Sequence, residues 1–273
     1  MTTERCGFVG LGDQGGGIAL RIAQRGVSLM VWARRPEVLG RFVEAGATVA
    51  PSLAELGSSC PLVAVCVRTD DDLREVTLGE GRLLASMAAG SSLAVHSTVA
   101  PATVRTVAAE GAARGIAVVD APVSGGSAGA AAGTMSVIAG GDPAVIARWR
   151  PVWQTHATQI SLLGPVGAGQ LAKLVNNALS AANLGLALQA LGSSAELGLD
   201  RAALGEILGG SSAASFMVGV ARVMPPEGQI QAASLLRKDV DLFHRIAEGP
   251  EAKALAAAAE AAVVHLERLA ARV

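Results

Sequence analysis

The stretch that decides the fold is Cys6-Gly7-Phe8-Val9-Gly10-Leu11-Gly12-Asp13-Gln14-Gly15. Its first half is an apolar run that predicts a buried strand, and the residues from Gly15 to Arg25 predict a helix. The GxGxxG pattern between strand and helix is typical of a dinucleotide-binding loop. The first glycine allows the tight turn, the second lets the pyrophosphate approach the backbone, and the third lets the helix pack closely. The helix N-terminus then faces the phosphates. We therefore expect a dinucleotide to be bound by Gly10, Leu11, Gly12, Asp13, Gln14 and Gly15.

Short β-rich runs alternate with helical patterns through the segment that follows this loop. Further strands are expected at 28–32, 62–67, 92–96 and 116–120. Helical patterns lie between them, for example from Pro101 to Arg114, with the proline at a tolerated first-turn position. This alternation predicts an α/β domain of the Rossmann type, with a doubly wound parallel sheet.

The pattern changes after Gly164. From Gly167 to about Leu197 no strand signal is present, and the run rich in Ala and Leu predicts one long helix, followed by further helical patterns. The expected organisation is a dinucleotide-binding domain at 1–163 and an all-α substrate and dimerisation domain at 164–273. The long helix is apolar on most faces and must be covered by the first domain or by a second subunit. We therefore expect a homodimer or a higher homo-oligomer.

Composition excludes several classes of function. The 273 residues are 51% apolar and carry a formal net charge of −1, with a mean hydropathy of +0.45, which gives no electrostatic footprint for nucleic acid or for an anionic membrane. No apolar stretch approaches the roughly 20 residues that cross a bilayer. The N-terminal residues 1–5 lack the pattern of a signal peptide. The three cysteines and four histidines lack metal-ligand spacing. The sequence thus predicts a cytoplasmic protein without a metal, a nucleic-acid partner or a membrane partner.

The end of the second expected strand bears on the type of dinucleotide. An NAD site usually has Asp or Glu there for the ribose hydroxyls. This chain instead has Val31-Trp32-Ala33-Arg34-Arg35-Pro36, with no acid. The guanidinium groups of Arg34 and Arg35 are suited to a 2′-phosphate. NADP(H) is therefore the expected cofactor and NAD(H) the alternative. A solvated arginine pair at a helix start is the other interpretation of these residues.

A loop of small residues follows the strand that ends near Asp120. Ser124, Gly125 and Gly126 offer a hydroxyl and exposed backbone N–H groups, which together are able to hold a carboxylate. An ordinary flexible loop would have the same composition.

Lysine is rare in this chain, since Lys173, Lys238 and Lys253 are the only lysines among 22 basic residues. Lys173 and Asn177 are four residues apart near the start of the long helix and share one face. Burial in an apolar helix would lower the pKa of a lysine and let it exchange a proton with a substrate oxygen. Arginine cannot replace it, because guanidinium does not deprotonate in proteins. A lysine with its ammonium at the surface is the alternative.

Five blocks in order make this sequence similar to the β-hydroxyacid dehydrogenase family, whose members include 3-hydroxyisobutyrate dehydrogenase and tartronate semialdehyde reductase. The blocks are Gly7 to Gly12 with Gly15; Ser97-Thr98-Val99-Ala100-Pro101; Asp120 to Gly126 with Gly129 and Gly133-Thr134; Gly167 to Asn177; and Lys238-Asp239. The resemblance implies a Rossmann-type domain, an all-α second domain and a site between them.

The resemblance also implies a role for individual residues. Lys173 would be the proton donor or acceptor, and Asn177 would hold the substrate together with Ser124, Gly125 and Gly126. Thr98 would lie near the nicotinamide, and Lys238 would close over cofactor and substrate. The chain departs from the family pattern at Gln14, where Met is frequent, and at Arg68, where small residues or Pro are common. Val67 and Arg68 are expected beside the adenosine half of the cofactor.

These observations predict reversible hydride transfer between NADP(H) and a small, carboxylate-bearing 3-hydroxy acid or its semialdehyde. An imine or other carbonyl reductase on the same scaffold is one alternative. A cofactor-binding interaction protein without catalysis is another, because a fold does not by itself imply a function. The pair Lys173 and Asn177 favours an enzyme, since a binding module has no chemical reason to keep both.

Overall fold

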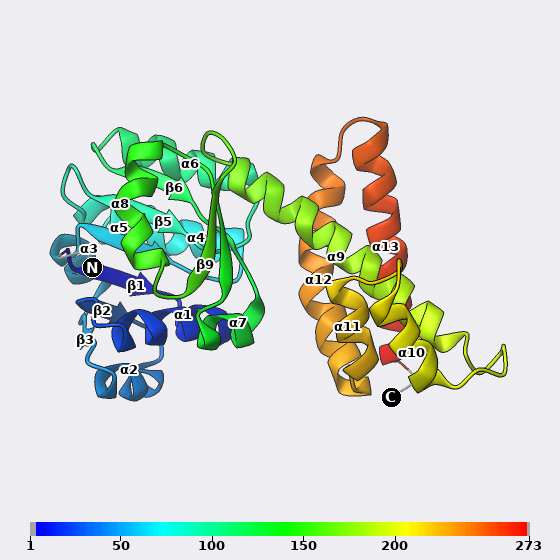
Figure 1. Cartoon of the computed structure of the whole chain (residues 1–273). Coiled ribbons are helices and arrows are strands. Elements are labelled where there is room, and N and C mark those ends of the chain that lie inside the picture. The colour runs from blue at the N-terminus through cyan, green and yellow to red at the C-terminus, as the bar shows by residue number, and fades with distance from the viewer. Residues whose placement is uncertain (1–3, 272–273) are drawn as a thin grey trace. The chain divides into compact units, whose positions relative to one another are not determined.

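The computed structural model describes residues 4–271 (Figure 1). The prediction that residues 1–5 lack the pattern of a signal peptide falls partly on residues 1–3, which lie outside the described residues. The chain forms two compact units, residues 1–173 and residues 174–273. The predicted boundary at Gly164 stays a prediction, because the long helix α9 (Ala168–Gly192) contributes residues to both units.

The first unit contains a six-stranded parallel sheet with the order β3-β2-β1-β4-β5-β6. The strands are β1 (Cys6–Val9), β2 (Leu29–Trp32), β3 (Thr48–Val49), β4 (Leu62–Val65), β5 (Ser92–Val95) and β6 (Ala117–Asp120). The chain leaves β1 in one direction along the sheet for β2 and β3 and returns on its other side for β4. This reversal is the topological switch point of a doubly wound sheet, where ligands bind at the carboxyl ends of the strands. The predicted Rossmann-type fold is confirmed.

Helices and a short 3₁₀ turn connect these strands. They are α1 (Asp13–Gln24), η1 (Pro36–Val38), α2 (Gly40–Glu44), α3 (Leu53–Ser59), α4 (Asp70–Thr77), α5 (Leu83–Ser86) and α6 (Pro101–Ala112). Side chains alternate between the two faces of the sheet along each strand. In β4, Leu62 and Ala64 enter one hydrophobic core, which also holds the α1 residue Ile18, whereas Val63 and Val65 enter the other. Both faces are therefore buried, which explains why the strands are continuous apolar runs.

A second, three-stranded sheet follows, with the order β7-β8-β9. Its strands are β7 (Val123–Ser124), β8 (Met135–Ala139) and β9 (Ala157–Leu162), and β8 pairs with β7 antiparallel and with β9 in parallel. The other elements of this region are α7 (Gly126–Ala132) and α8 (Pro143–Trp153). The composition of the segment after Asp120 predicts a loop. The structure corrects this, because a strand and a helix occupy most of the segment, and Gly133 with φ +74° is the C-cap of the helix.

The second unit is helical, as predicted. After α9 come α10 (Arg201–Gly210), α11 (Phe216–Val223), α12 (Pro226–Ile246) and α13 (Pro250–Ala270). Helix α9 ends at Gly192, earlier than predicted, and turns follow it. Helices α12 and α13 lie side by side (Figure 1), where Arg237 forms ion pairs with Glu260 and Glu267. Gly185 allows α9 to approach α13 closely, since a Cβ at this position would lie 2.4 Å from the Cβ of Ala262.

None of the helices in the described part of the chain is both long enough and apolar enough to span a membrane.

Candidate active site

A cleft of about 330 Å³ lies at the carboxyl ends of β1, β2 and β4. Seven of the residues predicted to bind the cofactor line it: Gly10, Leu11, Gly12, Arg34, Arg35, Val67 and Arg68. Asp13, Gln14 and Gly15 form the first turn of α1, which begins directly after the loop. The structure thus gathers the glycine loop, the arginines after β2 and the end of β4 around one cavity.

The glycine loop has the shape that a pyrophosphate requires. Gly10 has φ +95°, and a Cβ there would lie 2.1 Å from the carbonyl oxygen of Cys66. A Cβ at Gly15 would lie 2.1 Å from the carbonyl oxygen of Gly10. Gly12 differs, because a Cβ at this position would meet no atom of the described residues within 4 Å. Gly12 is also the N-cap of α1 and provides no side-chain cap. Open space at Gly12 thus adjoins the first turn of α1, whose N–H groups have no acceptors within the helix, and the site fits the phosphates of a dinucleotide.

The charges at the end of the cleft that is lined by Arg34 are mixed. Arg34 is 63% exposed and pairs with Asp72, with 3.3 Å between Nη2 and Oδ1, and with Glu75, with 3.7 Å between Nη1 and Oε2. Asp72 itself lines the cleft. No acid stands at the end of β2, but Asp72 reaches Arg34 from the start of α4, and no local sequence pattern predicted this contact.

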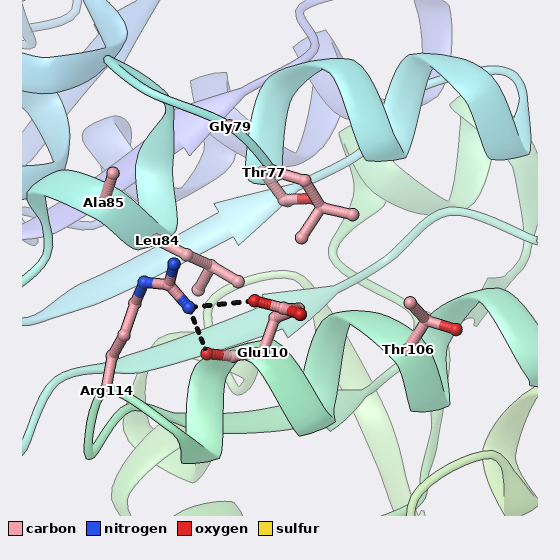
Figure 2. A pocket seen from close by; sticks show the side chains of 8 residues that line it. Thr77, Gly79, Leu84, Ala85, Thr106, Glu110 and Arg114 are labelled. Atoms are coloured by element: carbon pink, nitrogen blue, oxygen red, sulfur yellow. Dashed lines mark hydrogen bonds and ion pairs between the residues drawn. The ribbon is translucent and has the colours of Figure 1, made fainter.

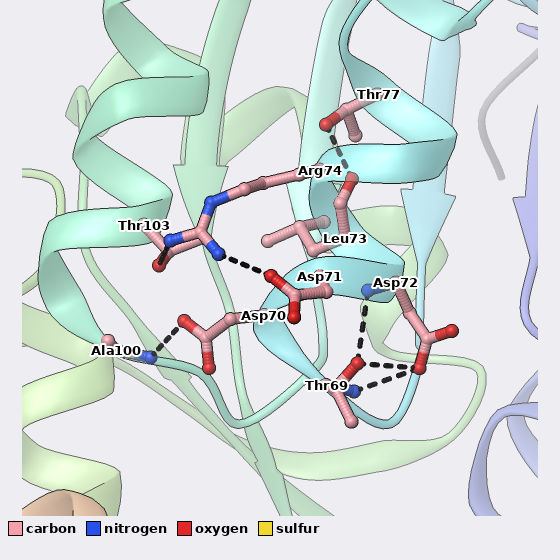
Figure 3. A network of polar contacts seen from close by, with 9 residues as sticks. All are labelled: Thr69, Asp70, Asp71, Asp72, Leu73, Arg74, Thr77, Ala100 and Thr103. Carbon is pink, nitrogen blue, oxygen red and sulfur yellow. Dashed lines mark hydrogen bonds and ion pairs between the residues drawn. The ribbon is translucent and has the colours of Figure 1, made fainter.

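Figure 3 shows how the start of α4 is held. Thr69 and Asp72 form a capping box, in which the Thr69 hydroxyl accepts from the Asp72 N–H and the Asp72 carboxylate accepts from the Thr69 N–H. Asp70 accepts a hydrogen bond of 3.0 Å from the N–H of Ala100, just before α6. Arg74 donates to the hydroxyl of Thr103 within α6. The loops after β4 and β5 are thereby fixed to each other.

The loop after β5 contains Thr98, the residue expected near the nicotinamide, which is half-buried. The residues before and after Thr98 both form hydrogen bonds with other segments of the chain. The Ser97 hydroxyl accepts from the N–H of Val67 at 2.8 Å. The side chain of Gln170, in α9, accepts from the N–H of Val99 at 3.0 Å and donates to the carbonyl oxygen of Ser97 at 2.8 Å. Gln170 thus joins the loop to the start of α9.

Asp120 holds the start of α9 from the other side. Its carboxylate is fully buried and accepts hydrogen bonds of 2.7 Å from the N–H groups of Gly167 and Gln170. Burial raises the pKa of the carboxyl group, while these hydrogen bonds oppose the change. A helix start has N–H groups without helical partners, and Asp120 satisfies two of the N–H groups there. Lys173 follows Gln170 by about one turn and is buried, with 8% of its surface exposed.

The helical unit contains a second polar group. Asn177, half-buried in α9, donates from Nδ2 to Oδ2 of Asp239 at 2.5 Å. Asp239 is buried, and its Oδ1 lies 3.0 Å from Nζ of Lys238. Asp239, which has no predicted role, therefore brings together two predicted substrate-binding residues, Asn177 and Lys238.

The remaining predicted substrate-binding residues belong to the first unit. Ser124 ends β7, Gly125 is the N-cap of α7 with φ +127°, and Gly126 is the first residue of α7 with φ +61°. Such backbone angles suit glycine and place successive N–H groups in a turn.

His96 immediately precedes Ser97 and is buried in the core of the first unit. Its Nδ1–H donates to the carbonyl oxygen of Ala121 at 2.7 Å, and its ring meets that of His156 edge to face. Burial lowers the pKa of His96 to about 4 and that of His156 to about 3. Both rings are neutral near pH 7, so they contribute packing rather than charge.

A second cavity, of about 290 Å³, lies between α4, α5 and α6 (Figure 2). Arg114 beside it donates to the carboxylate and the carbonyl oxygen of Glu110, both at 2.9 Å. The residues that line this cavity include none of the predicted site residues: Thr77, Leu78, Gly79, Leu84, Ala85, Thr106, Glu110 and Arg114.

Comparisons with known proteins agree with this geometry. Residues 5–164 match the model of the NAD binding domain of 6-phosphogluconate dehydrogenase, and residues 167–271 match the NAD-binding model of NADP-dependent 3-hydroxyisobutyrate dehydrogenase. A 3-hydroxyisobutyrate dehydrogenase from Pseudomonas aeruginosa is 36% identical over 80% of this chain and 73% of its own length. An NAD-dependent L-serine dehydrogenase from the same organism is 33% identical over 81% of this chain and 74% of its length.

A solved structure supports the fold. The 3-hydroxyisobutyrate dehydrogenase of Mycobacterium tuberculosis with L-serine has a TM-score of 0.84 and 24% identity, covering 98% of this chain and 99% of its own.

The fold and the glycine loop define a nicotinamide-dinucleotide oxidoreductase. The chain belongs to the β-hydroxyacid dehydrogenase family, which confirms the resemblance seen in the sequence. Its reaction is the NAD(P)-dependent oxidoreduction of a hydroxyacid.

Proposed function

We propose that this protein transfers a hydride between NADP(H) and a small 3-hydroxy acid or its semialdehyde, with Lys173 as the proton donor and acceptor. The observation that carries the proposal is the burial of Lys173 one turn beyond Gln170, which is hydrogen-bonded to the loop containing Thr98. Gln170 and Asp120 fix the start of α9, and Lys173 is buried there. A buried side chain on a fixed helix has few accessible positions, and general acid catalysis requires such a defined position of the ammonium group.

The proposed chemistry divides between cofactor and protein. NADP(H), when bound, supplies the hydride for reduction and accepts it in oxidation. In reduction, Nζ of Lys173 gives its proton to the carbonyl oxygen of the semialdehyde, while the carbonyl carbon gains the hydride. In oxidation, the neutral amine takes the proton of the hydroxyl group. Asn177 and Lys238 hold the substrate in this proposal, and Asp239 fixes both side chains.

A preference for NADP is supported by the arginines of the cleft. Arg34, Arg35 and Arg68 all line it, and β2 ends at Trp32 without an acid. Guanidinium groups bind phosphate through charge-assisted hydrogen bonds. Val67 lines the same cavity and, in this proposal, contacts the adenosine half.

Removal of the Arg34 side chain tests this preference. In Arg34→Ala, the KM for NADPH is expected to rise about tenfold or more, because a charge-assisted contact to the 2′-phosphate is lost. The KM for NADH should change little, since that cofactor has a neutral hydroxyl group there. Arg25→Ala, at the exposed C-terminal end of α1, is the matched control and should leave both values unchanged. An unchanged KM for NADPH in Arg34→Ala would show that this arginine does not recognise the phosphate.

The substrate is proposed to carry a carboxylate, held by Ser124 and the N–H groups of Gly125 and Gly126. The conformation of this segment supports a cradle for an anion, since the two glycines have positive φ. Relatives of this chain are named for 3-hydroxyisobutyrate and L-serine, both of which carry a carboxylate.

A pair of matched substrates tests the cradle. The neutral amide of the preferred hydroxy acid is expected to lose about 10- to 100-fold in kcat/KM, because its hydrogen bonds are not charge-assisted. A change of substrate leaves the protein unaltered, whereas a bulky substitution at Gly125 would also strain the backbone, because φ at this position is +127°. A panel of short hydroxy acids, each with its amide and with both cofactors, gives the measurement. An amide that reacts as fast as its acid would exclude the cradle.

Self-association is part of the proposal. Val175, Leu179 and Leu186 lie on α9 at helical spacing and are 45%, 50% and 63% exposed. An exposed apolar stripe of this kind is typical of a subunit contact and supports the expected homodimer or higher oligomer.

A further inference from the structure

We propose that Asp72 limits the preference of this protein for NADP, because its carboxylate is held beside Arg34 and opposes the binding of a 2′-phosphate. The inference rests on the proposed function only in so far as the cleft binds NADP(H). Asp72 is thus a specificity-determining residue, contributed by α4 and not by the end of β2.

The first support is the position of the carboxylate. Asp72 and Arg34 line the same cleft, and 3.3 Å separates Oδ1 of Asp72 from Nη2 of Arg34. Glu75, one turn further along α4, lies 3.7 Å from Nη1 of the same guanidinium group. Two carboxylates therefore already neutralise the arginine that is expected to recognise the phosphate.

The second support is that Asp72 is held in place. Its Oδ2 accepts hydrogen bonds from the Thr69 N–H at 3.2 Å and from the Thr69 hydroxyl at 2.8 Å (Figure 3). Its own N–H donates back to that hydroxyl at 3.0 Å, and only 22% of its side chain is exposed. Rotation of the carboxylate away from the cleft would break the capping box of α4, so the negative charge stays beside Arg34.

The consequence differs between the two cofactors. A 2′-phosphate that binds Arg34 must take the place of Asp72 as its partner and comes to lie near a fixed negative charge, which repels it. A 2′-hydroxyl group is neutral and carries neither penalty. The ion pair therefore lowers the affinity for NADP(H) and leaves that for NAD(H) nearly unchanged.

Substitution by asparagine isolates this effect. In Asp72→Asn, the side-chain oxygen is still able to accept from the Thr69 N–H, so the cap is kept while the charge is removed. Dissociation constants for NADPH and NADH are measured without substrate, from the quenching of tryptophan fluorescence, since Trp32 lines the cleft. The Kd for NADPH is expected to fall about 3- to 10-fold, as for one partly exposed charge pair, and the Kd for NADH to change less than about twofold.

Asp71→Asn is the matched control. Asp71 lies in the same turn of α4 and is 94% exposed, but it pairs with Arg74 and not with Arg34. The control removes the same charge and should leave both dissociation constants unchanged. Glu75→Gln removes the second carboxylate without touching the cap, and it should lower the Kd for NADPH by a smaller factor. In an Arg34→Ala background, Asp72→Asn should change the Kd for NADPH by a smaller factor. Without the guanidinium group, the 2′-phosphate no longer has to replace Asp72 as the partner of Arg34.

Three results would overturn the inference: an unchanged or weaker affinity of Asp72→Asn for NADPH, equal factors for NADPH and NADH, or the same gain in Asp71→Asn. If Asp72→Asn does not fold, Asp72→Ser decides in its place, because it also removes the charge beside Arg34, and an unchanged Kd for NADPH in that variant refutes the inference. A wild-type protein that binds NADH but not NADPH would refute the proposed cofactor instead. A protein that binds NADPH but turns over no hydroxy acid would refute the proposed reaction and leave the role of Asp72 intact.

Discussion

Lys173→Ala is expected to lower kcat for the preferred hydroxy acid by about 10²- to 10⁴-fold, the usual loss when a general acid or base is removed. Alanine has no proton to give to the substrate oxygen, so that proton would have to come from water. The affinity for NADPH should stay nearly intact, because in the described part of the chain Lys173 is not among the residues that line the dinucleotide cleft. Steady-state kinetics and a direct NADPH titration together measure both properties.

Two further variants show whether the loss of activity comes from the missing proton transfer, from the missing positive charge or from a less stable protein. Lys173→Arg keeps a positive charge but should remain slow, since guanidinium does not deprotonate at working pH. Lys253→Ala removes an exposed lysine from α13 and should behave as the wild-type protein does. Activity of Lys173→Ala within a few-fold of wild type would remove this residue from the mechanism.

Gly12→Val is expected to raise the Kd for NADPH and for NADH by about 100-fold, while the protein stays folded. A Cβ at Gly12 meets no described atom within 4 Å, and the φ of −71° suits any residue, so the fold tolerates the change. The same open space lies before the first turn of α1, where the pyrophosphate is expected, and the valine side chain would fill it. Several charge-assisted hydrogen bonds to the phosphates would then be lost together.

Gly40→Val provides the control for this experiment. Gly40 begins α2 in the same unit, and a Cβ there also meets no described atom within 4 Å. Thermal unfolding should give similar melting temperatures for the two variants, and only Gly12→Val should lose binding. Wild-type affinity in Gly12→Val would mean that the phosphates do not approach the backbone at this glycine.

The main sheet could be predicted because its strands are buried on both faces and therefore read as continuous apolar runs. β3 was missed because it has two residues, Thr48 and Val49, and both are exposed. The second sheet was missed for a related reason, since only one of the six residues of β9 is buried and β7 has two residues. Helix α7, rich in Gly and Ala, lacks the apolar periodicity that marks a helix in a sequence.

The candidate site likewise contains residues that a local sequence pattern predicts and residues that only the structure reveals. The residues of the glycine loop are contiguous, so a local pattern predicts them. Asp72, Asp120 and Asp239 act through partners far away in the sequence: Arg34, Gly167 and Asn177. No periodicity or spacing records such contacts. A local signal existed for Asp120, because a charged residue at the end of a buried apolar strand needs hydrogen-bond partners.

The anchoring of α9 by Asp120 has a consequence for how such enzymes diversify. Asp120, Gln170 and Lys173 all belong to the first unit, whereas Asn177 and its partner Asp239 belong to the second. In the proposed function, the proton-transferring group thus belongs to the nucleotide-binding unit, and the amide one turn later belongs to the helical unit. A recombination point between Lys173 and Leu174 would exchange the helical unit without disturbing the anchor of the lysine, so this arrangement is compatible with a change of substrate by shuffling as well as by point mutation.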